Sequence, residues 1–175
     1  MRARTIIGLL VALVPIAVGA AQPCLKMVFN QFCLGGSQQT LSSVTMPKAS
    51  VKSSNPDQIG YDDGGKFVGV VIKKGRVAIV GRTEAPATRL HYLELKAKLT
   101  DIYGPPDKDF SYIPASGADD PEYQAVLIHL GKAKLVKAWV EDAWSIRLVW
   151  DQRGMVLIYV ADNLSSSKEE NSGGL

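Results

Sequence analysis

Two cysteines and two histidines are the side chains best suited to chemistry in this 175-residue chain. Cys24 and Cys33 lie nine positions apart, whereas a redox-active pair normally has the spacing C-x-x-C. His91 and His129 are far from both thiols and lack the spacing of metal ligands, so no zinc site is predicted. Neither histidine has a serine, cysteine or carboxylate at an interpretable spacing, and the chain contains no G-x-S-x-G, H-E-x-x-H or P-loop motif. We therefore predict no catalytic residue, no metal ion and no cofactor.

Acidic residues gather in two short stretches of the chain. The stretch "YDDGGK" contains Asp62 and Asp63, and "GADDPEY" contains Asp119, Asp120 and Glu122. Oxygen ligands of this kind can hold Ca²⁺, but neither stretch has the spacing of an EF-hand loop. Acidic residues beside glycine or proline are ordinary in turns, and the turn interpretation is preferred for both stretches.

Residues 1–20 have the pattern of an export signal. Arg2 and Arg4 form a short positive start, and an uncharged apolar run extends from Ile6 to Val18. Small residues at the end of the segment predict cleavage directly after Ala20. The apolar run is too short for a bilayer crossing, so we expect an exported, periplasmic or secreted protein that is soluble after cleavage and has no membrane span. The alternative is an uncleaved N-terminal anchor.

The charge balance disfavours some classes of partner. The full chain has 20 basic and 17 acidic residues, and removing Arg2 and Arg4 leaves a net charge of +1. The basic side chains are scattered along the chain. This distribution lacks the electrostatic footprint of a protein that binds nucleic acid.

Export also changes the interpretation of the two cysteines. An oxidising compartment favours a disulfide between Cys24 and Cys33. A straight helix would place two such residues roughly 13 Å apart, whereas a disulfide needs Cα atoms within about 7 Å. The intervening segment "LKMVFNQF" must therefore fold back as a loop or broken turn if the cysteines pair. The alternative is two free thiols.

Two helices are predicted to support these residues. Ser37 is a plausible N-cap for a short helix that ends before Pro47. The clearest helix covers about 87–103 and ends at Gly104, which two prolines follow. Its apolar stripe, expected to pack on a sheet, is formed by Tyr92, Leu95, Leu99, Ile102 and Tyr103.

Strand patterns fill most of the remaining chain. Tight-turn signals in "YDDGGK" and "KKGR" separate predicted strands over 66–73 and 76–82. Later strands are predicted over 122–130, 134–140, 144–150 and 155–161. In 144–150 the apolar residues alternate with Ser145 and Arg147, which indicates one buried face.

The short connections require antiparallel neighbours. The predicted fold class is therefore α+β, with an antiparallel β-meander of four to six strands, the 87–103 helix packed on it and a short N-terminal helix. One domain is expected over 21–163. The tail over 164–175 is polar and is expected to be disordered.

Two short stretches resemble parts of the small outer-membrane assembly proteins of the BamE type. "LGGSQQTLSSV" is similar to a glycine-serine helix start, and "LTDIYGPP" is similar to a helix ended by Gly-x-Pro. The two stretches cover a small part of the chain. The lipidation cysteine of that family is missing from the cleavage point, so the resemblance does not assign the chain to the family.

The segment from Phe110 to Tyr123 is the predicted binding site for a protein partner. It joins the main helix to the strand-rich third of the chain, and long irregular connections in compact domains are often functional. The alternative is an ordinary surface hairpin whose aromatic rings pack across strands. The predicted partner-binding residues are Phe110, Tyr112, Asp119, Asp120, Glu122 and Tyr123.

Taken together, these patterns predict an exported, non-enzymatic binding protein that acts on a protein partner, for example as an inhibitor or immunity-type protein. One alternative is a structural or assembly accessory of the cell envelope, which would use an exposed sheet edge for strand addition. A second alternative is a small hydrolase whose catalytic residues are far apart in the sequence.

Overall fold

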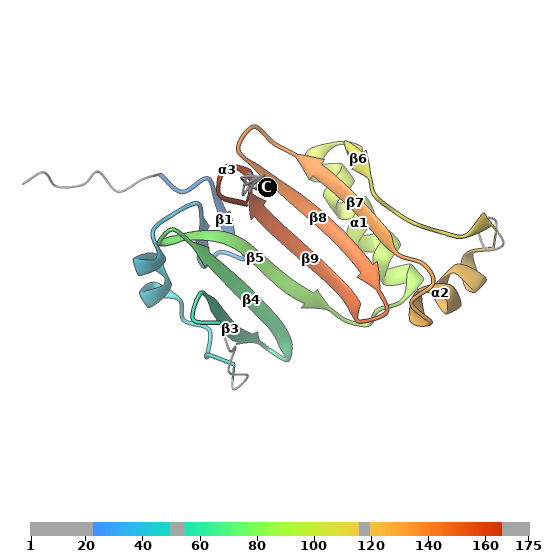
Figure 1. Cartoon of the computed structure of the whole chain (residues 1–175), viewed down its shortest axis with the longest axis horizontal. Coiled ribbons are helices and arrows are strands. Elements are labelled where there is room, and N and C mark those ends of the chain that lie inside the picture. Colours follow the sequence, from blue (N-terminus) through green and yellow to red (C-terminus); the bar gives the residue numbers. More distant parts are fainter. Residues whose placement is uncertain (1–22, 50–54, 116–119, 166–175) are drawn as a thin grey trace, which may run out of the picture.

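The computed structural model describes residues 23–49, 55–115 and 120–165 (Figure 1). Within these ranges the chain forms a seven-stranded sheet, a two-stranded hairpin and four helices. The elements are, in chain order, β1 (Lys26–Val28), β2 (Phe32–Leu34), the 3₁₀ helix η1 (Gln38–Ser43), β3 (Gln58–Asp63), β4 (Lys66–Lys73), β5 (Arg76–Glu84), α1 (Arg89–Tyr103), β6 (Lys108–Asp109), α2 (Pro121–His129), β7 (Leu135–Val140), β8 (Trp144–Asp151), β9 (Gly154–Ala161) and α3 (Asp162–Ser165).

The large sheet is antiparallel throughout, with the strand order β3-β4-β5-β9-β8-β7-β6. The predicted α+β class and antiparallel meander are confirmed. The chain builds two meanders, β3–β5 and β7–β9, and the pairing of β5 with β9 joins them. The last strand, β9, therefore lies in the middle of the sheet.

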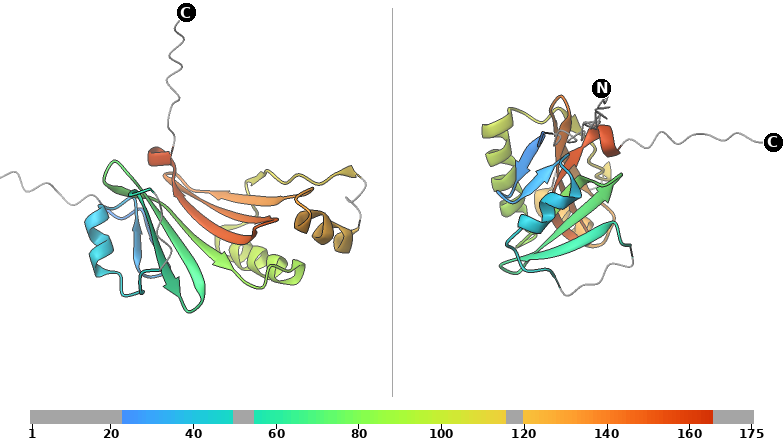
Figure 2. Two further views of the ribbon diagram at one scale, coloured as in Figure 1. Left: turned by 60° about the horizontal axis from the view of Figure 1, so that its bottom comes forward. Right: turned by 90° about the vertical axis from the view of Figure 1, so that its left-hand side faces the viewer.

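Helix α1 packs on one face of this sheet, which we call the inner face (Figure 2). Thr88 caps its first turn with its side chain, and Gly104, with φ of 80°, follows its last residue. Tyr92 and Leu99 are buried against the sheet as predicted. The prediction was wrong for Ile102, which is 69% exposed. At 3.6 residues per turn, Ile102 falls at the edge of the apolar stripe rather than at its centre.

Two clusters of buried side chains cover the inner face. The first lies beneath α1 and α2 and includes Ile146 and Leu148 of β8, both 0% exposed. The second lies beneath the β1–β2 hairpin and includes Phe32 and Val68. Arg147, between the two buried residues of β8, is exposed on the opposite, outer face. The predicted alternation of this strand is confirmed.

The tip of the β1–β2 hairpin connects the two clusters. Phe29 has φ of 48°, which is unusual for a bulky residue. Its ring packs edge-on against Tyr159, with a centroid distance of 5.6 Å, and the guanidinium of Arg82 lies 4.1 Å from its centroid. These contacts hold the turn against the centre of the inner face.

Residues 122–130, predicted as a strand, instead belong mostly to helix α2. The Asp120 carboxylate accepts hydrogen bonds from the backbone N–H groups of Glu122 and Tyr123, at 2.9 and 3.1 Å. Pro121 occupies the first position of the helix, where its missing N–H is harmless. The start signal Asp-Pro therefore overrides the β-branched composition of the segment, and His129 lies in a helix rather than a strand.

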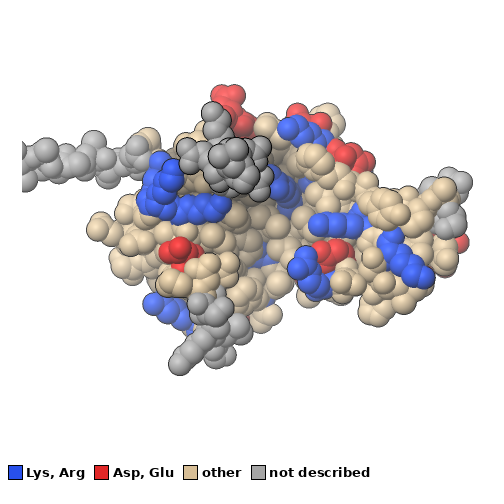
Figure 3. All heavy atoms as spheres, viewed as in Figure 1, with Lys and Arg blue, Asp and Glu red and all other residues tan. Residues whose placement is uncertain are grey.

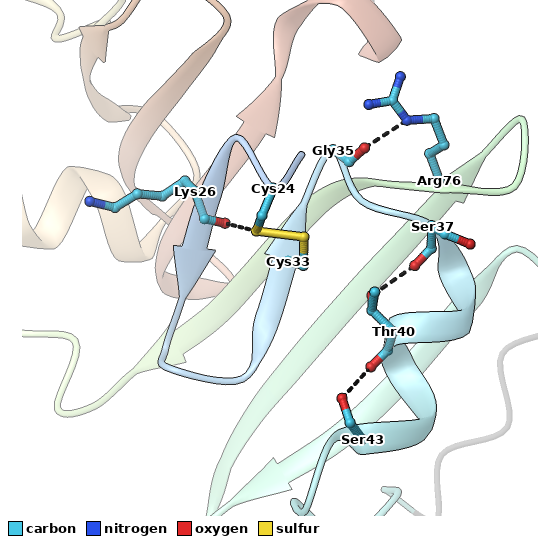
Figure 4. Close-up of a disulfide and its surroundings, with 8 residues drawn as sticks. All are labelled: Cys24, Lys26, Cys33, Gly35, Ser37, Thr40, Ser43 and Arg76. Atoms are coloured by element: carbon cyan, nitrogen blue, oxygen red, sulfur yellow. Dashed lines mark hydrogen bonds between the residues drawn. A yellow bond between two sulfur atoms is a disulfide. The ribbon is translucent and has the colours of Figure 1, made fainter. Parts of the chain in front are cut away.

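The predicted disulfide between Cys24 and Cys33 is present, with Cα atoms 5.2 Å apart (Figure 4). As predicted, the intervening segment folds back, and it does so as the β1–β2 hairpin. The Gly35 carbonyl then accepts a 2.6 Å hydrogen bond from Arg76 Nε, which ties the hairpin to β5. The predicted short helix follows as η1, with Ser37 as its N-cap.

Helix α3 closes the described part of the chain. Asp162 Oδ1 accepts a 2.9 Å hydrogen bond from the hydroxyl of Ser145, so Ser145 is buried although it lies on the outer face. Leu164, assigned to the tail in the sequence analysis, packs against the second cluster. The remainder of that predicted tail, 166–175, lies outside the described residues, as does the predicted signal segment 1–20.

None of the helices in the described ranges combines the length and the apolar character that a membrane crossing needs.

Candidate functional site

Phe110 and Tyr112 continue the line of β6 along the edge of β7. The backbone N–H of Phe110 donates to the Val136 carbonyl at 2.9 Å, and Tyr112 and Lys134 exchange two backbone hydrogen bonds of 2.8 Å. This register points both rings to the outer face. Phe110 is 58% exposed and Tyr112 is 65% exposed, so the rings lie on the surface rather than packing across strands.

The acidic residues of the predicted site have mainly local structural roles. Asp120 is the N-cap of α2, and Glu122 lies in its first turn, where a negative charge stabilises the helix dipole. Asp119 lies outside the described residues. Tyr123 is 43% exposed on α2. The structure gives no ring contact between Tyr123 and either Phe110 or Tyr112, so the predicted residues do not form one compact cluster.

Two residues that the sequence analysis missed extend the exposed apolar surface. Val126 and Leu130 follow Tyr123 at helical spacing and are 51% and 57% exposed. We call these two residues, together with Tyr123, Phe110 and Tyr112, the apolar end. Figures 1 and 2 place α2 and the segment after β6 at the same end of the molecule. Five of the eleven exposed large hydrophobic residues in the described ranges belong to it.

The outer face of the sheet carries a second apolar feature, a groove of about 480 Å³ over β3, β4, β5 and β9. Its floor is a row of three glycines, Gly60, Gly69 and Gly81, which are direct partners across three neighbouring strands. Figure 3 shows this face hollowed between the two ends of the molecule, with Lys and Arg side chains around the hollow. The side chains that border the floor are Phe67, Val71, Ile79, Val156 and Ile158, with Gln58 and Thr83 as polar members.

A basic hollow adjoins the groove on the same face. Arg147 is the cross-strand partner of Ile158, so it continues the row that contains Gly81. Arg147 also lines a neighbouring hollow of about 280 Å³ together with Phe110, Lys134 and Val136. The basic hollow therefore adjoins the groove at Arg147 and the apolar end at Phe110.

The inner face contains a cluster of charges around Glu84, whose side chain is 1% exposed. Lys66 Nζ lies 2.7 Å from one carboxylate oxygen, and Arg82 lies 2.9 Å from the other. Arg82 also pairs with Asp63 at 3.0 Å. His91 Nε2 is 4.0 Å from the same oxygen of Glu84 that Lys66 contacts. The buried carboxylate is thus neutralised by two cations, as a structural ion-pair network requires.

The histidines were the residues on which the hydrolase alternative depended. Nδ1 of His91 lies 3.6 Å from a carboxylate oxygen of Glu94, and its buried Nε2, 4.0 Å from Glu84, has no hydrogen-bond partner among the described residues. His129 lines a cavity of about 260 Å³ with Thr88 and Asp151. Thr88 caps α1, however, and Asp151 accepts two hydrogen bonds from Arg153. These side chains therefore have local structural partners.

The buried Tyr92 and the half-buried Tyr159 have raised pKa values. Burial, followed by the nearby Tyr103, raises the pKa of Tyr159 to about 12. Burial and then the charge of Asp109 raise the pKa of Tyr92 above its ordinary value. Both hydroxyls therefore remain protonated at neutral pH and are unsuited to act as a general base.

In the parts of the chain that the structure describes, no group of three or more His, Cys, Asp or Glu residues could hold a metal ion. No protein-family model, curated protein or solved structure matches the chain.

Proposed function

We propose that the protein is an exported, non-enzymatic binding protein that acts on a protein partner through the apolar end, with an inhibitor or immunity-type role as its specific form. The observation that carries this proposal is that five exposed large hydrophobic side chains lie between residues 110 and 130, two on the outer face beside β7 and three on α2 at the same end of the molecule. A concentration of exposed apolar side chains in one region favours an interaction site. Tyrosine is also enriched among the residues that dominate binding energy.

The sheet edges favour contact through side chains over strand addition. At β3, the Pro47 carbonyl accepts from the Asp62 N–H and the Ala49 N–H donates to the Gly60 carbonyl, both at 2.9 Å. At the other edge, the Asp109 carboxylate accepts from the Ser111 N–H at 2.9 Å. A covered edge and a charged edge both discourage pairing with another chain. This weighs against an envelope accessory that assembles by strand addition.

The exported location is part of the proposal. It is supported by the charged and apolar pattern of residues 1–20 and by the Cys24–Cys33 disulfide, which suits an oxidising compartment.

Site-specific photo-crosslinking in the host organism tests the proposal. A photo-reactive amino acid replaces Tyr112 in one variant and Ile102 in a control variant, because Ile102 is equally exposed but lies on α1. We expect a single protein adduct from position 112 and none from position 102.

The affinity for the captured protein then provides the second measurement. Val126→Ser should weaken binding at least tenfold, as expected for an apolar anchor, whereas Ile102→Ser should leave it unchanged. Circular dichroism checks that both variants fold. The absence of an adduct at position 112, or equal effects of the two serine variants, would contradict the proposal. Capture of several subunits of one envelope complex would support the assembly alternative instead.

A further inference from the structure

We propose that the glycine-floored groove on the outer face binds the alkyl chain of a free fatty acid, with the carboxylate of the ligand at Arg147. This site meets the apolar end only at Phe110, which lines the hollow of Arg147, and the proposal does not depend on the proposed protein partner. The groove volume of about 480 Å³ lies within the range of about 300–1,000 Å³ that is typical of small-ligand sites.

The chemistry of the groove suits a chain without polar atoms. Its bordering side chains are aliphatic or aromatic except for Gln58 and Thr83. The Thr83 hydroxyl oxygen already accepts a 2.9 Å hydrogen bond from the Phe67 N–H. The backbone of the floor is paired within the sheet ladder. An extended peptide lying here would bury N–H and C=O groups without partners, which is costly, whereas an alkyl chain has none to satisfy.

The glycine row gives the groove a direction. A Cβ atom would lie 2.6 Å from the Phe67 ring at Gly60 and 3.3 Å from it at Gly69, so this ring covers the floor at β3 and β4. A Cβ atom at Gly81 would meet nothing closer than 3.7 Å, so the floor is open toward β9. The open end leads across Ile158 to Arg147, its neighbour on β8.

The charge at the open end selects an anionic head group. Arg147 is exposed and takes part in no ion pair with the residues that the structure describes. Lys134 lines the same hollow and adds a second cation. Desolvation would raise the pKa of the neighbouring Asp151, but hydrogen bonds from Arg153 and then the charge of Lys134 lower it. An arginine fork matches a carboxylate in geometry as well as charge. An apolar groove with a cation at its open end is complementary to the alkyl chain and carboxylate of a fatty acid.

Calorimetric titration of the full folded protein tests the site, with monomeric dodecanoate as the probe. We expect saturable binding of one dodecanoate per chain. Across the series from octanoate to tetradecanoate the affinity should rise roughly twofold for each added methylene, since each becomes about half buried. Dodecanol should bind several-fold more weakly, and dodecylamine more weakly still.

Two pairs of variants distinguish the part of the site that binds the alkyl chain from the part that binds the carboxylate. Gly81→Leu should fill the groove and weaken dodecanoate at least tenfold, while the matched Gly81→Ala should weaken it less than threefold, because its Cβ makes only ordinary contacts. Arg147→Gln should weaken dodecanoate roughly fivefold and leave dodecanol unchanged. The control Arg153→Gln removes an exposed arginine already paired with Asp151 and should change neither.

Other outcomes would overturn the proposal. These are no binding by the folded wild-type protein, equal affinity for dodecanoate and dodecylamine, or wild-type affinity in folded Gly81→Leu. Binding to phosphatidylglycerol vesicles that dodecanoate does not displace would assign the face to a membrane surface instead. Ligand-independent dimerisation abolished by Gly81→Leu would assign it to a second copy of the chain. Neither result would bear on crosslinking at position 112, so the two proposals can fail separately.

Discussion

Asp109 shows how a single side chain at the sheet edge combines two roles. It blocks the edge by accepting a hydrogen bond from Ser111, and it forms an ion pair with Lys137 of β7. Desolvation would raise the pKa of this carboxyl group. The hydrogen bonds from Lys137 and Ser111 outweigh that effect and lower the pKa from 3.8 to about 2.

The lowered pKa of Asp109 predicts a pH-dependent contribution to stability. A carboxylate whose pKa is depressed on folding stabilises the fold above its unfolded pKa, and this contribution is lost as the pH falls through the folded value. Asp109→Asn should therefore lower the free energy of unfolding by under about 1 kcal/mol at pH 7, since the side chain is 55% exposed. The deficit should disappear between about pH 4 and pH 2.

Urea unfolding at several pH values measures this difference. Asp142→Asn is the matched control because Asp142 is exposed and has no ion pair among the described residues, and it should change little at any pH. A deficit for Asp109→Asn that is the same at pH 7 and pH 2 would show that the carboxylate charge is not its cause.

At the scale of elements, turn signals and strand-favouring composition were sufficient to predict β4, β5, β7, β8 and β9. Clean alternation identified the buried face of β8. Composition failed at α2, where Val126 and Ile128 favour a strand. The local hydrogen bonds of Asp120 and the proline at the first helical position decide the structure there. A closer reading of Asp120-Pro121 as a helix start would have found it.

The groove and the apolar end were harder to predict from the sequence because both depend on which strands pair and in what register. Gly60, Gly69 and Gly81 are separated in the sequence, and only the register of β3, β4 and β5 brings them into one row. Phe110 and Tyr112 were recognised as candidates from their loop. Their exposure and their direction toward the outer face follow from the pairing of this segment with β7, which composition alone does not reveal.

Among the elements, the β1–β2 hairpin closed by the disulfide gives a testable prediction of stability. Cys24→Ser and Cys33→Ser should each lower the free energy of unfolding by roughly 2–3 kcal/mol, because both remove the same constraint on the unfolded chain. Mass spectrometry of the unreduced exported protein should show two hydrogens fewer than the dithiol. Reduced wild-type protein is the matched control, and its free energy of unfolding should equal that of the two variants. Free thiols after native export would refute the pairing.

Across the whole molecule, the two faces of the sheet are unequal. The inner face is covered by α1, α2 and the β1–β2 hairpin, and the outer face carries the groove.

Substitutions at two neighbouring residues of β8, one on each face, test this difference in burial. Leu148→Ala should lower the free energy of unfolding by about 2–5 kcal/mol, since Leu148 is fully buried. Arg147→Ala should lower it by under about 1 kcal/mol. Equal losses in chemical unfolding would be incompatible with the face assignment.

The central place of β9 has a consequence for the order in which the chain can fold as it is synthesised. The β3–β5 meander and the strands β7 and β8 are built from local pairings that form early, but β5 and β8 each leave one edge bare until residues 154–161 have been made. Bare edges are templates for mispairing. A nascent or truncated chain that stops before β9 therefore consists of two half-sheets, each with an unpaired edge strand that can pair wrongly. Insertion of β9 pairs both edges at once.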